Sequence, residues 1–376
     1  MAIAGAIDEA ADAVAAQATQ APWFAWMDFF RTAAAVIVVV SHARDIVMAD
    51  YNGNLAYAPF YAATGFGHSG VVVFFVLSGF WISRSVLGRL DSPNFWRDYL
   101  IDRLSRLLIV LVPALMVGGL LDWVGAVEFG FPLYSGTSGS HSIISPILPK
   151  LGGEVLLGNL AFLQTILVPT WGSNGPLWSL AAEFWYYVWF PALALLFVKR
   201  KFSLGLAGLA VAWLNPGIAF GFASWLLGFA LMWLSPMTAT KRARPWQTGA
   251  GAAIFLAVLL LSGIRTGAAI DFVLALAFAG LLFMLRAGSV PLPRLFEPLA
   301  RYGRNSSYSL YVIHFPLVAL VGSWATAGTR QAASPLGVVL TLALTLGSMV
   351  AAWAFSYLTE RNTGKARALV RSHLAS

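Results

Sequence analysis

Cysteine is absent from this chain of 376 residues, and charged residues are scarce, at 11% against roughly 25% in a soluble domain. Without cysteine there is no disulfide, no thiolate nucleophile and no cysteine-ligated metal. Hydrophobic residues make up 59% of the chain and gather in runs of about 20, the length that spans a bilayer as a helix. The composition therefore predicts an all-α, polytopic transmembrane helical bundle.

The net charge of +8 does not point to nucleic acid. The basic residues lie in short stretches between the apolar runs, at 84–106, 199–201, 241–244, 286–304 and 361–371. Membrane proteins carry such an excess of Lys and Arg in their cytosolic connections. We therefore expect membrane lipid, not nucleic acid, around this protein, with these stretches in the cytosol.

The apolar runs predict about ten spans with both termini in the cytosol. Three lie at 27–46, 67–87 and 104–124, and seven more begin near 176, 202, 216, 246, 270, 307 and 336. The segment 151–169 is more polar and ends at a proline, so we interpret it as re-entrant or interfacial. This divides the chain into a cytosolic extension (1–22), a membrane domain (23–360) and a basic cytosolic tail (361–376).

Arg31 and His42 lie in the first predicted span, within FFRTAAAVIVVVSHAR. Eleven residues make about three helical turns, so both side chains share one helix face, about 16 Å apart along the axis. Ionisable groups in an apolar helix are costly unless they face the protein interior or an aqueous cavity. An isolated helix would use Arg31 as an interface anchor and His42 as a satisfied polar residue. The remaining motifs favour a functional site instead.

Glu183 lies about seven residues into its predicted span, at about the depth of His42. An intramembrane carboxylate is a site candidate that can orient an imidazole, although a structural pairing with arginine is equally open. His314 is expected in the cytosolic half of its span, in either a structural or a site role. The tryptophans at 171, 178, 185 and 189 predict an interfacial belt, with a sugar platform as the alternative.

Arg103 and Arg106 are three residues apart and therefore neighbours on one helix face. Two guanidiniums suit a multiply charged anion such as the phosphates of coenzyme A, although paired arginines beside a span also serve as orientation signals. Ser78 precedes Gly79 inside the second span, where small residues favour helix packing over a nucleophile. The five histidines show no metal-ligand spacing, so we predict no metal site.

Five pieces occur in an order that is similar to a known family. They are R-x10-H at 31–42, FFVLSGFWIS at 74–83, R-x-x-R at 103–106, PLWSLAAEFWYY at 176–187 and SSYSLYVIHFPL at 306–317. The chain resembles the acyltransferase-3 family of bacterial integral membrane acyltransferases. It resembles the standalone form of that family, without the appended esterase-like domain.

The resemblance implies a multi-pass enzyme of the bacterial inner membrane. Such an enzyme transfers an acyl group, most often acetyl, from cytosolic acetyl-CoA to a hydroxyl of an exported or lipid-linked glycan. His42 becomes the acyl-transfer residue, Arg31 its partner and Glu183 a site carboxylate. Arg103, Arg106 and Ser78 become the candidate donor-binding residues.

We favour His42 as a general base, with a transient acyl-histidine as the alternative. The alternative function is a glycan-lipid transporter or flippase. Transporters often contain two related halves with corresponding broken helices. We find no such repeat in the sequence, and the pair of Arg31 and His42 has no counterpart later in the chain.

Overall fold

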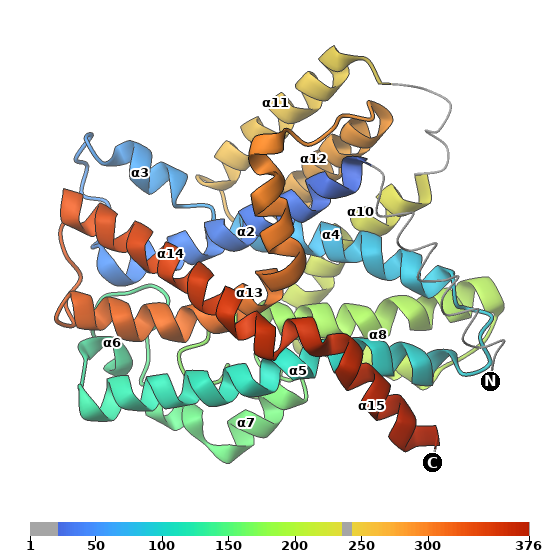
Figure 1. Ribbon diagram of the computed structural model, residues 1–376, viewed down its shortest axis with the longest axis horizontal. Coiled ribbons are helices and arrows are strands. Elements are labelled where there is room, and N and C mark those ends of the chain that lie inside the picture. Colours follow the sequence, from blue (N-terminus) through green and yellow to red (C-terminus); the bar gives the residue numbers. More distant parts are fainter. Residues whose placement is uncertain (1–21, 235–242, 376) are drawn as a thin grey trace.

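The computed structural model describes residues 22–234 and 243–375, and Figure 1 shows their arrangement. Within these residues the regular structure is helical; no strand forms, and only two isolated bridges occur. Nine helices of the described part are long and apolar enough to cross a membrane. The predicted all-α polytopic bundle is confirmed. The predicted extension 1–22, except its last residue, and the basic positions 241–242 lie outside the described residues.

The long helices are α2 (Pro22–Val47), α4 (Gly67–Leu87), α5 (Phe95–Trp123), α8 (Leu177–Lys199), α10 (Pro216–Leu234), α11 (Pro245–Ser262), α12 (Ala268–Ala287), α13 (Glu297–Ala325) and α14 (Pro335–Leu358). The short helices are α3 (Ala58–Ala63), α6 (Pro132–Ser135), α7 (Gly153–Leu160), α9 (Ala210–Leu214) and α15 (Thr363–Ala375). A π-helical turn, η1 (Val124–Glu128), extends α5. Short 3-10 helices are η2 (Leu148–Leu151), η3 (Leu204–Leu209), η5 (Arg294–Phe296) and η6 (Glu360–Asn362).

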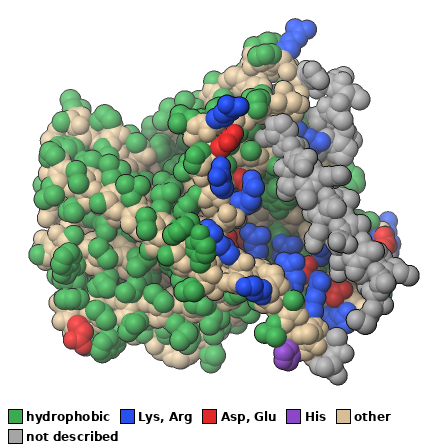
Figure 2. Space-filling model, in the orientation of Figure 1, with side chains coloured by type: hydrophobic (Ala, Val, Ile, Leu, Met, Phe, Trp, Pro, Cys, Tyr) green, Lys and Arg blue, Asp and Glu red, His purple; other side chains and the backbone are tan. Residues whose placement is uncertain are grey.

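The two ends of the bundle differ in chemistry. At the end we call the basic end, Arg84 lies over the ring of Phe24 near the start of α2, and Arg371 of α15 binds Asp102 of α5. At the opposite end, the loop end, residues 128–175 connect α5 to α8. Figure 2 shows hydrophobic side chains over the left part of the molecule and Lys and Arg gathered toward the right. An apolar flank between polar ends is what a bundle that spans lipid requires.

Helix α2 lies at the centre of the packing, in contact with α4, α13 and α14. Its Ala35 and Val39 join the main hydrophobic core, whereas Ala34 and Val38 face two neighbouring clusters. The Thr32 hydroxyl donates to the Leu299 carbonyl of α13 at 2.7 Å, which fixes the register of these two helices near the basic end. The helix that carries Arg31 and His42 is therefore enclosed by protein, as the site interpretation of these residues requires.

Helices α5 and α13 begin well before the residues we predicted. Helix α5 starts at Phe95 rather than near 104, so Arg103 and Arg106 lie inside a continuous helix. Helix α13 starts at Glu297 rather than near 307, because a polar first half, EPLARYGRNSS, packs against α2 instead of ending in solvent. His314 is therefore 17 residues from the start of a helix of 29 residues, in its loop-end half. We expected His314 in the half nearer the basic connections, which we predicted to be cytosolic; it lies in the other half.

The span predicted near 202 is not a long helix. It consists of η3 and α9, which pack against the side of α8 through a hydrogen bond from Trp189 Nε1 to the Gly208 carbonyl. The chain leaves Lys199 at the basic end and reaches Asn215, whose side-chain amide donates to the Thr165 carbonyl at 3.1 Å. This short return makes the number of passes even, because Trp23 and Arg371 both lie at the basic end.

Helices α4 and α10 approach each other more closely than side chains would permit. A Cβ atom added to Gly79 would lie 2.0 Å from the Trp225 carbonyl oxygen, and one added to Gly228 would lie 2.0 Å from that of Val76. Both positions therefore require glycine. This agrees with the packing interpretation of the Ser78–Gly79 pair.

We expect Gly228→Ala to destabilise the protein, because forcing a methyl group into a packed contact costs about 1–3 kcal/mol. The midpoint of thermal unfolding in detergent, followed by tryptophan fluorescence, measures this. Gly280→Ala is the matched control, since a Cβ atom there meets nothing within 4 Å, and it should leave the midpoint unchanged or raise it. Equal midpoints for the two variants would contradict the close approach.

Candidate active site

Two histidines meet between α2 and α13. His42 Nδ1 lies 3.0 Å from His314 Nε2, and the rings are nearly parallel at 16° with centroids 5.3 Å apart. Phe315 packs edge-on against His42. His314 is completely buried, whereas His42 is partly exposed. The pair thus presents one reachable imidazole backed by one that is held inside the protein.

The hydrogen bonds of His314 determine which nitrogen of each ring carries a proton. His314 Nδ1 lies 2.8 Å from the Tyr311 carbonyl and 3.1 Å from that of Leu310, so it must donate. A neutral imidazole carries one proton, which leaves His314 Nε2 as an acceptor and His42 Nδ1 as its donor. His42 Nε2 then has a free lone pair, and it has no partner among the described residues. In the neutral pair, His42 Nε2 is ready to accept a proton.

A proline and an asparagine shape the turn that holds His314. Pro316 has no N–H group, so it leaves the Val312 carbonyl without its helical partner. Asn174 Nδ2 donates to that carbonyl at 2.8 Å from the loop before α8. The same loop is anchored to α5, because the backbone N–H of Ser173 donates to the buried Asp122 carboxylate at 2.6 Å. The loop 171–175 therefore supports the turn of α13 that carries His314.

Arg31 lies toward the basic end of α2 and does not contact His42. Its guanidinium is 3.4 Å from the Asp28 carboxylate, which Arg304 of α13 also binds at 3.0 Å. The charges of Arg106, Glu183 and Glu360 also act on Arg31. Arg31 is thus part of a cluster of charges deep in the basic half of the bundle, while His42 stands at the other end of the same helix.

Glu183 takes part in a different contact from the one we expected. Its carboxylate accepts a hydrogen bond of 2.5 Å from the Tyr187 hydroxyl, one turn along α8. The residue that orients His42 is His314 instead. The charge of Glu183 acts on Arg31 and on the tyrosines at 99, 308 and 311, which places it in the polar interior between the charge cluster and the histidines.

The three candidate donor-binding residues lie toward the basic half of the bundle. Arg103 Nη2 donates to Ser85 Oγ at 3.2 Å and its guanidinium lies 5.7 Å from the centre of the Tyr99 ring. Arg106 is exposed, and its charge acts on Arg31 and Arg103. Ser78 accepts a hydrogen bond from Trp225 Nε1 at 3.2 Å, which is a packing role between α4 and α10. Of the three, Arg106 is the most accessible to a ligand.

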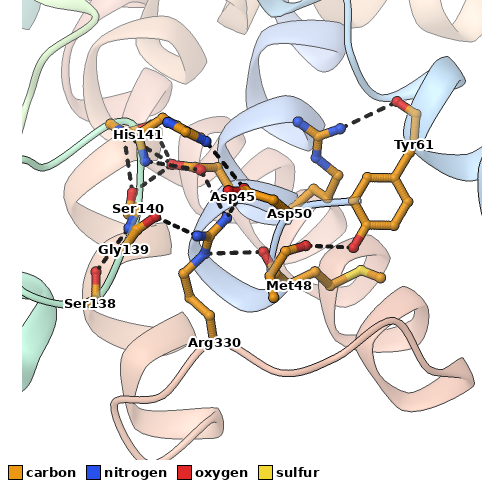
Figure 3. A network of polar contacts seen from close by, with 12 residues as sticks. Asp45, Met48, Asp50, Tyr61, Ser138, Gly139, Ser140, His141 and Arg330 are labelled. Atoms are coloured by element: carbon orange, nitrogen blue, oxygen red, sulfur yellow. Dashed lines mark hydrogen bonds and ion pairs between the residues drawn. The ribbon is translucent and has the colours of Figure 1, made fainter. Parts of the chain in front are cut away.

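A network of hydrogen bonds and ion pairs at the loop end was not predicted from the sequence (Figure 3). Asp45, one turn after His42, accepts hydrogen bonds from the Ser140 hydroxyl at 2.5 Å and the Ser142 hydroxyl at 2.7 Å. It also accepts from the backbone N–H groups of His141 and Ser142 at 3.2 and 3.1 Å. Asp45 therefore fastens the Gly/Ser-rich loop to the end of α2.

Arg330 completes this network from the connection between α13 and α14. It donates to the carboxylates of Asp45 and Asp50 at 3.3 and 2.8 Å, to the Met48 carbonyl at 3.1 Å, and to the Gly139 carbonyl. The hydrogen bond from Arg330 holds the pKa of the Asp50 carboxyl below its usual range. One guanidinium thus ties three distant segments together beside His42. Nothing in the sequence around Arg330 signals this role.

We expect Asp45→Asn to loosen the loop at 138–147. The substitution removes the charge, and hydrogen bonds to a charged group contribute about 1.5–3 kcal/mol each. Hydrogen exchange of the backbone amides at 140–142 should become faster in this variant. His141→Ala removes only the exposed contact with Asp50 and serves as the control. Unchanged exchange in Asp45→Asn would show that the loop is held by other contacts.

Comparison with known proteins places these residues in a family context. Residues 24–357 match a family described as an acyltransferase domain. The peptidoglycan O-acetyltransferase OatA of Listeria monocytogenes is 26% identical over 303 residues, which cover 68% of this chain and 45% of that protein. A protein of Staphylococcus aureus (strain COL), provisionally named an O-acetyltransferase, is 25% identical over 293 residues, or 69% and 47% of the two chains.

The chain spans about half the length of the curated relatives it matches. No solved structure matches it. The family match includes both histidines, Arg31, Glu183 and the R-x-x-R pair. It extends over all nine long helices except the first two residues of α2 and the last residue of α14. This multi-pass membrane protein belongs to the acyltransferase-3 family.

Proposed function

We propose that this chain is a transmembrane O-acyltransferase. It moves an acyl group, acetyl by preference, from acetyl-CoA bound at the basic end to a hydroxyl of a glycan or glycolipid at the loop end. The observation that carries the proposal is the pair of His42 and His314, which leaves His42 Nε2 as a free proton acceptor. The family and the names of the O-acetyltransferase relatives support the reaction class.

The proposed orientation follows from charge. Cytosolic connections of membrane proteins carry the excess of Lys and Arg, so the basic end faces the cytosol, where acyl-CoA is found. Both the start of α2 and the tail helix α15 then lie on the cytosolic side of the bacterial inner membrane. The loop end, with His42 near it, faces the opposite side and receives the acceptor.

The donor would enter along the charge cluster. Arg106 and Arg103 bind phosphate oxygens of coenzyme A, for which guanidiniums are well suited. Arg31 extends the positive charge one step further into the bundle. The long flexible arm of the donor can then extend parallel to α2 and bring the thioester toward His42. No group of three His, Cys, Asp or Glu side chains that could hold a metal ion occurs among the described residues.

In the chemical step, His42 Nε2 removes the proton of the acceptor hydroxyl as its oxygen attacks the thioester carbonyl. The C–S bond breaks, the coenzyme leaves as a thiolate, and the proton on His42 passes to that sulfur. The products are the acetyl ester and coenzyme A. His314 keeps the hydrogen bond to His42 Nδ1 throughout, and the nearby Asp45 charge acts on the imidazolium formed in between.

We expect His42→Ala to lose at least about 100-fold in transfer rate, the usual contribution of a general base. His314→Ala should also lose activity, because it removes the acceptor that fixes the tautomer of His42. His314→Gln should recover part of it, since the amide oxygen can accept the same hydrogen bond. The assay follows label from radioactive acetyl-CoA into a membrane glycolipid extract with purified protein in nanodiscs.

His141→Ala is the matched control, because His141 lies in the outer loop without contact to the pair. Full activity in His42→Ala would discard the proposed base but keep the enzyme. Equal loss in His314→Ala and His314→Gln would reject the tautomer argument. A wild-type protein that neither consumes acetyl-CoA nor labels glycolipid would favour the transporter alternative.

We expect Arg106→Gln to raise the KM for acetyl-CoA about tenfold, the effect of losing about 1.4 kcal/mol of binding. The kcat at saturating donor should change little, because the phosphates lie far from the reacting carbonyl. Arg97→Gln is the control on the same helix, since Arg97 is exposed and paired only with Asp98. If both variants keep the wild-type KM, the phosphates bind elsewhere.

A further inference from the structure

His68 of α4 pairs with Asp271 of α12. His68 Nε2 lies 2.9 Å from Asp271 Oδ2, at the loop-end starts of α4 and α12. Their side chains are 55% and 23% exposed, so both remain reachable by a ligand. A neighbouring contact, between the hydroxyls of Ser69 and Ser262 at 2.9 Å, holds α4 beside α11 at the same level.

Trp178 adjoins this pair from a third helix. Its ring is parallel to that of His68 within 14°, with centroids 6.1 Å apart. Phe75 supports the indole edge-on from the interior. The aromatic ring, the imidazole and the carboxylate therefore come from α8, α4 and α12 and meet at one place.

The indole N–H of Trp178 differs in its hydrogen bonding from those of three other tryptophans. Those of Trp171, Trp185 and Trp189 donate to the carbonyls of Leu115, Phe162 and Gly208, at 2.8, 3.0 and 2.7 Å. Trp178 Nε1 has no partner within the described residues. The first three tryptophans thus serve structure, whereas Trp178 keeps a donor available for a ligand.

This group of residues lies next to the proposed reacting centre. Gly67, the neighbour of His68, packs against Ser41, the neighbour of His42; a Cβ atom on Gly67 would lie 2.8 Å from Ser41 Oγ. On the other side, Ser179, the neighbour of Trp178, shares a hydrogen bond with the Tyr311 hydroxyl, and the ring centroids of Tyr311 and His314 are 6.0 Å apart. Two short chains of contacts therefore lead from this group to the histidine pair.

Helix α10 does not extend as far toward the loop end as Trp178 does. Helix α10 begins at Pro216, and the Tyr186 hydroxyl bonds to its Ile218 carbonyl at 2.8 Å, two turns further into the bundle than Trp178. The loop-end part of α8 therefore lacks α10 as a neighbour. Trp178 is only partly buried, so part of its ring remains accessible to a ligand.

We infer that Trp178, His68 and Asp271 form the binding site for a sugar ring of a lipid-linked acceptor; this rests on the proposed function. An aromatic face packs against the apolar C–H side of a sugar. A carboxylate, an imidazole and an indole N–H provide both acceptors and donors for its hydroxyls. A few convergent polar groups beside an aromatic wall are typical of small-ligand sites. Held there, the sugar presents a further hydroxyl toward His42.

The test uses the full-length protein in nanodiscs with radioactive acetyl-CoA and a membrane glycolipid extract as acceptor. Trp178→Ala and Asp271→Asn should each raise the extract concentration for half-maximal transfer about tenfold, the loss of one good contact. The KM for acetyl-CoA should stay that of the wild type. His141→Ala is the matched control, because His141 and Asp50 form another exposed pair at the loop end, 3.1 Å apart.

Unchanged half-saturation in both variants would overturn the inference while leaving the enzyme intact. The inference also fails if the wild type hydrolyses acetyl-CoA but transfers no label to glycolipid. Loss of both acetyl-CoA consumption and folding in Trp178→Ala, seen as aggregation on size exclusion, would assign it a structural role, and Asp271→Asn then decides the inference alone. A wild type that never consumes acetyl-CoA rejects the proposed function itself.

Discussion

The hydrogen bond between His42 and His314 is the constraint on which the rest of this structure depends. Inside a bundle embedded in lipid, no water is available to form hydrogen bonds with a polar group, so that group needs a hydrogen-bond partner within the protein. The imidazole contact and the bond from Thr32 to the Leu299 carbonyl lie at two levels of the same helix pair. Together they fix both the register and the rotation of α2 against α13.

This register places the charged Arg31 and the proposed base His42 at different levels of α2. Arg31 is held among charges of both signs in the basic half, whereas His42 faces a neutral partner near the loop end. A positive partner beside His42 would disfavour the imidazolium that forms when His42 accepts a proton. A carboxylate accepting from Nδ1 would keep the same tautomer but would add a negative charge to the apolar interior. The neutral His314 leaves Nε2 of His42 unprotonated without adding charge to the apolar interior.

Much of this arrangement could be predicted from the sequence, and the rest could not for definable reasons. Apolar length located the second span at residues 67–87 without error, since lipid thickness sets helix length. It failed for α13, where polar residues at 297–306 continue a helix because α2 covers them. His314 as the partner of His42, and Arg330 as that of Asp45, are contacts across 272 and 285 positions. Local patterns carry no information on such pairs.

The short return at 204–214 shows how a departure from regular packing can serve the site. A tenth long helix would have flanked α8 along its whole length. The 3-10 turn and α9 instead end beside Thr165, and α10 begins at the level of Tyr186. The described part of the chain keeps an even number of passes with nine long helices, and the segment 162–168, which is not a long helix, lies against the loop-end half of α8. Leu177, next to Trp178, therefore contacts a loop and not a long helix, at the level where we propose that the acceptor binds.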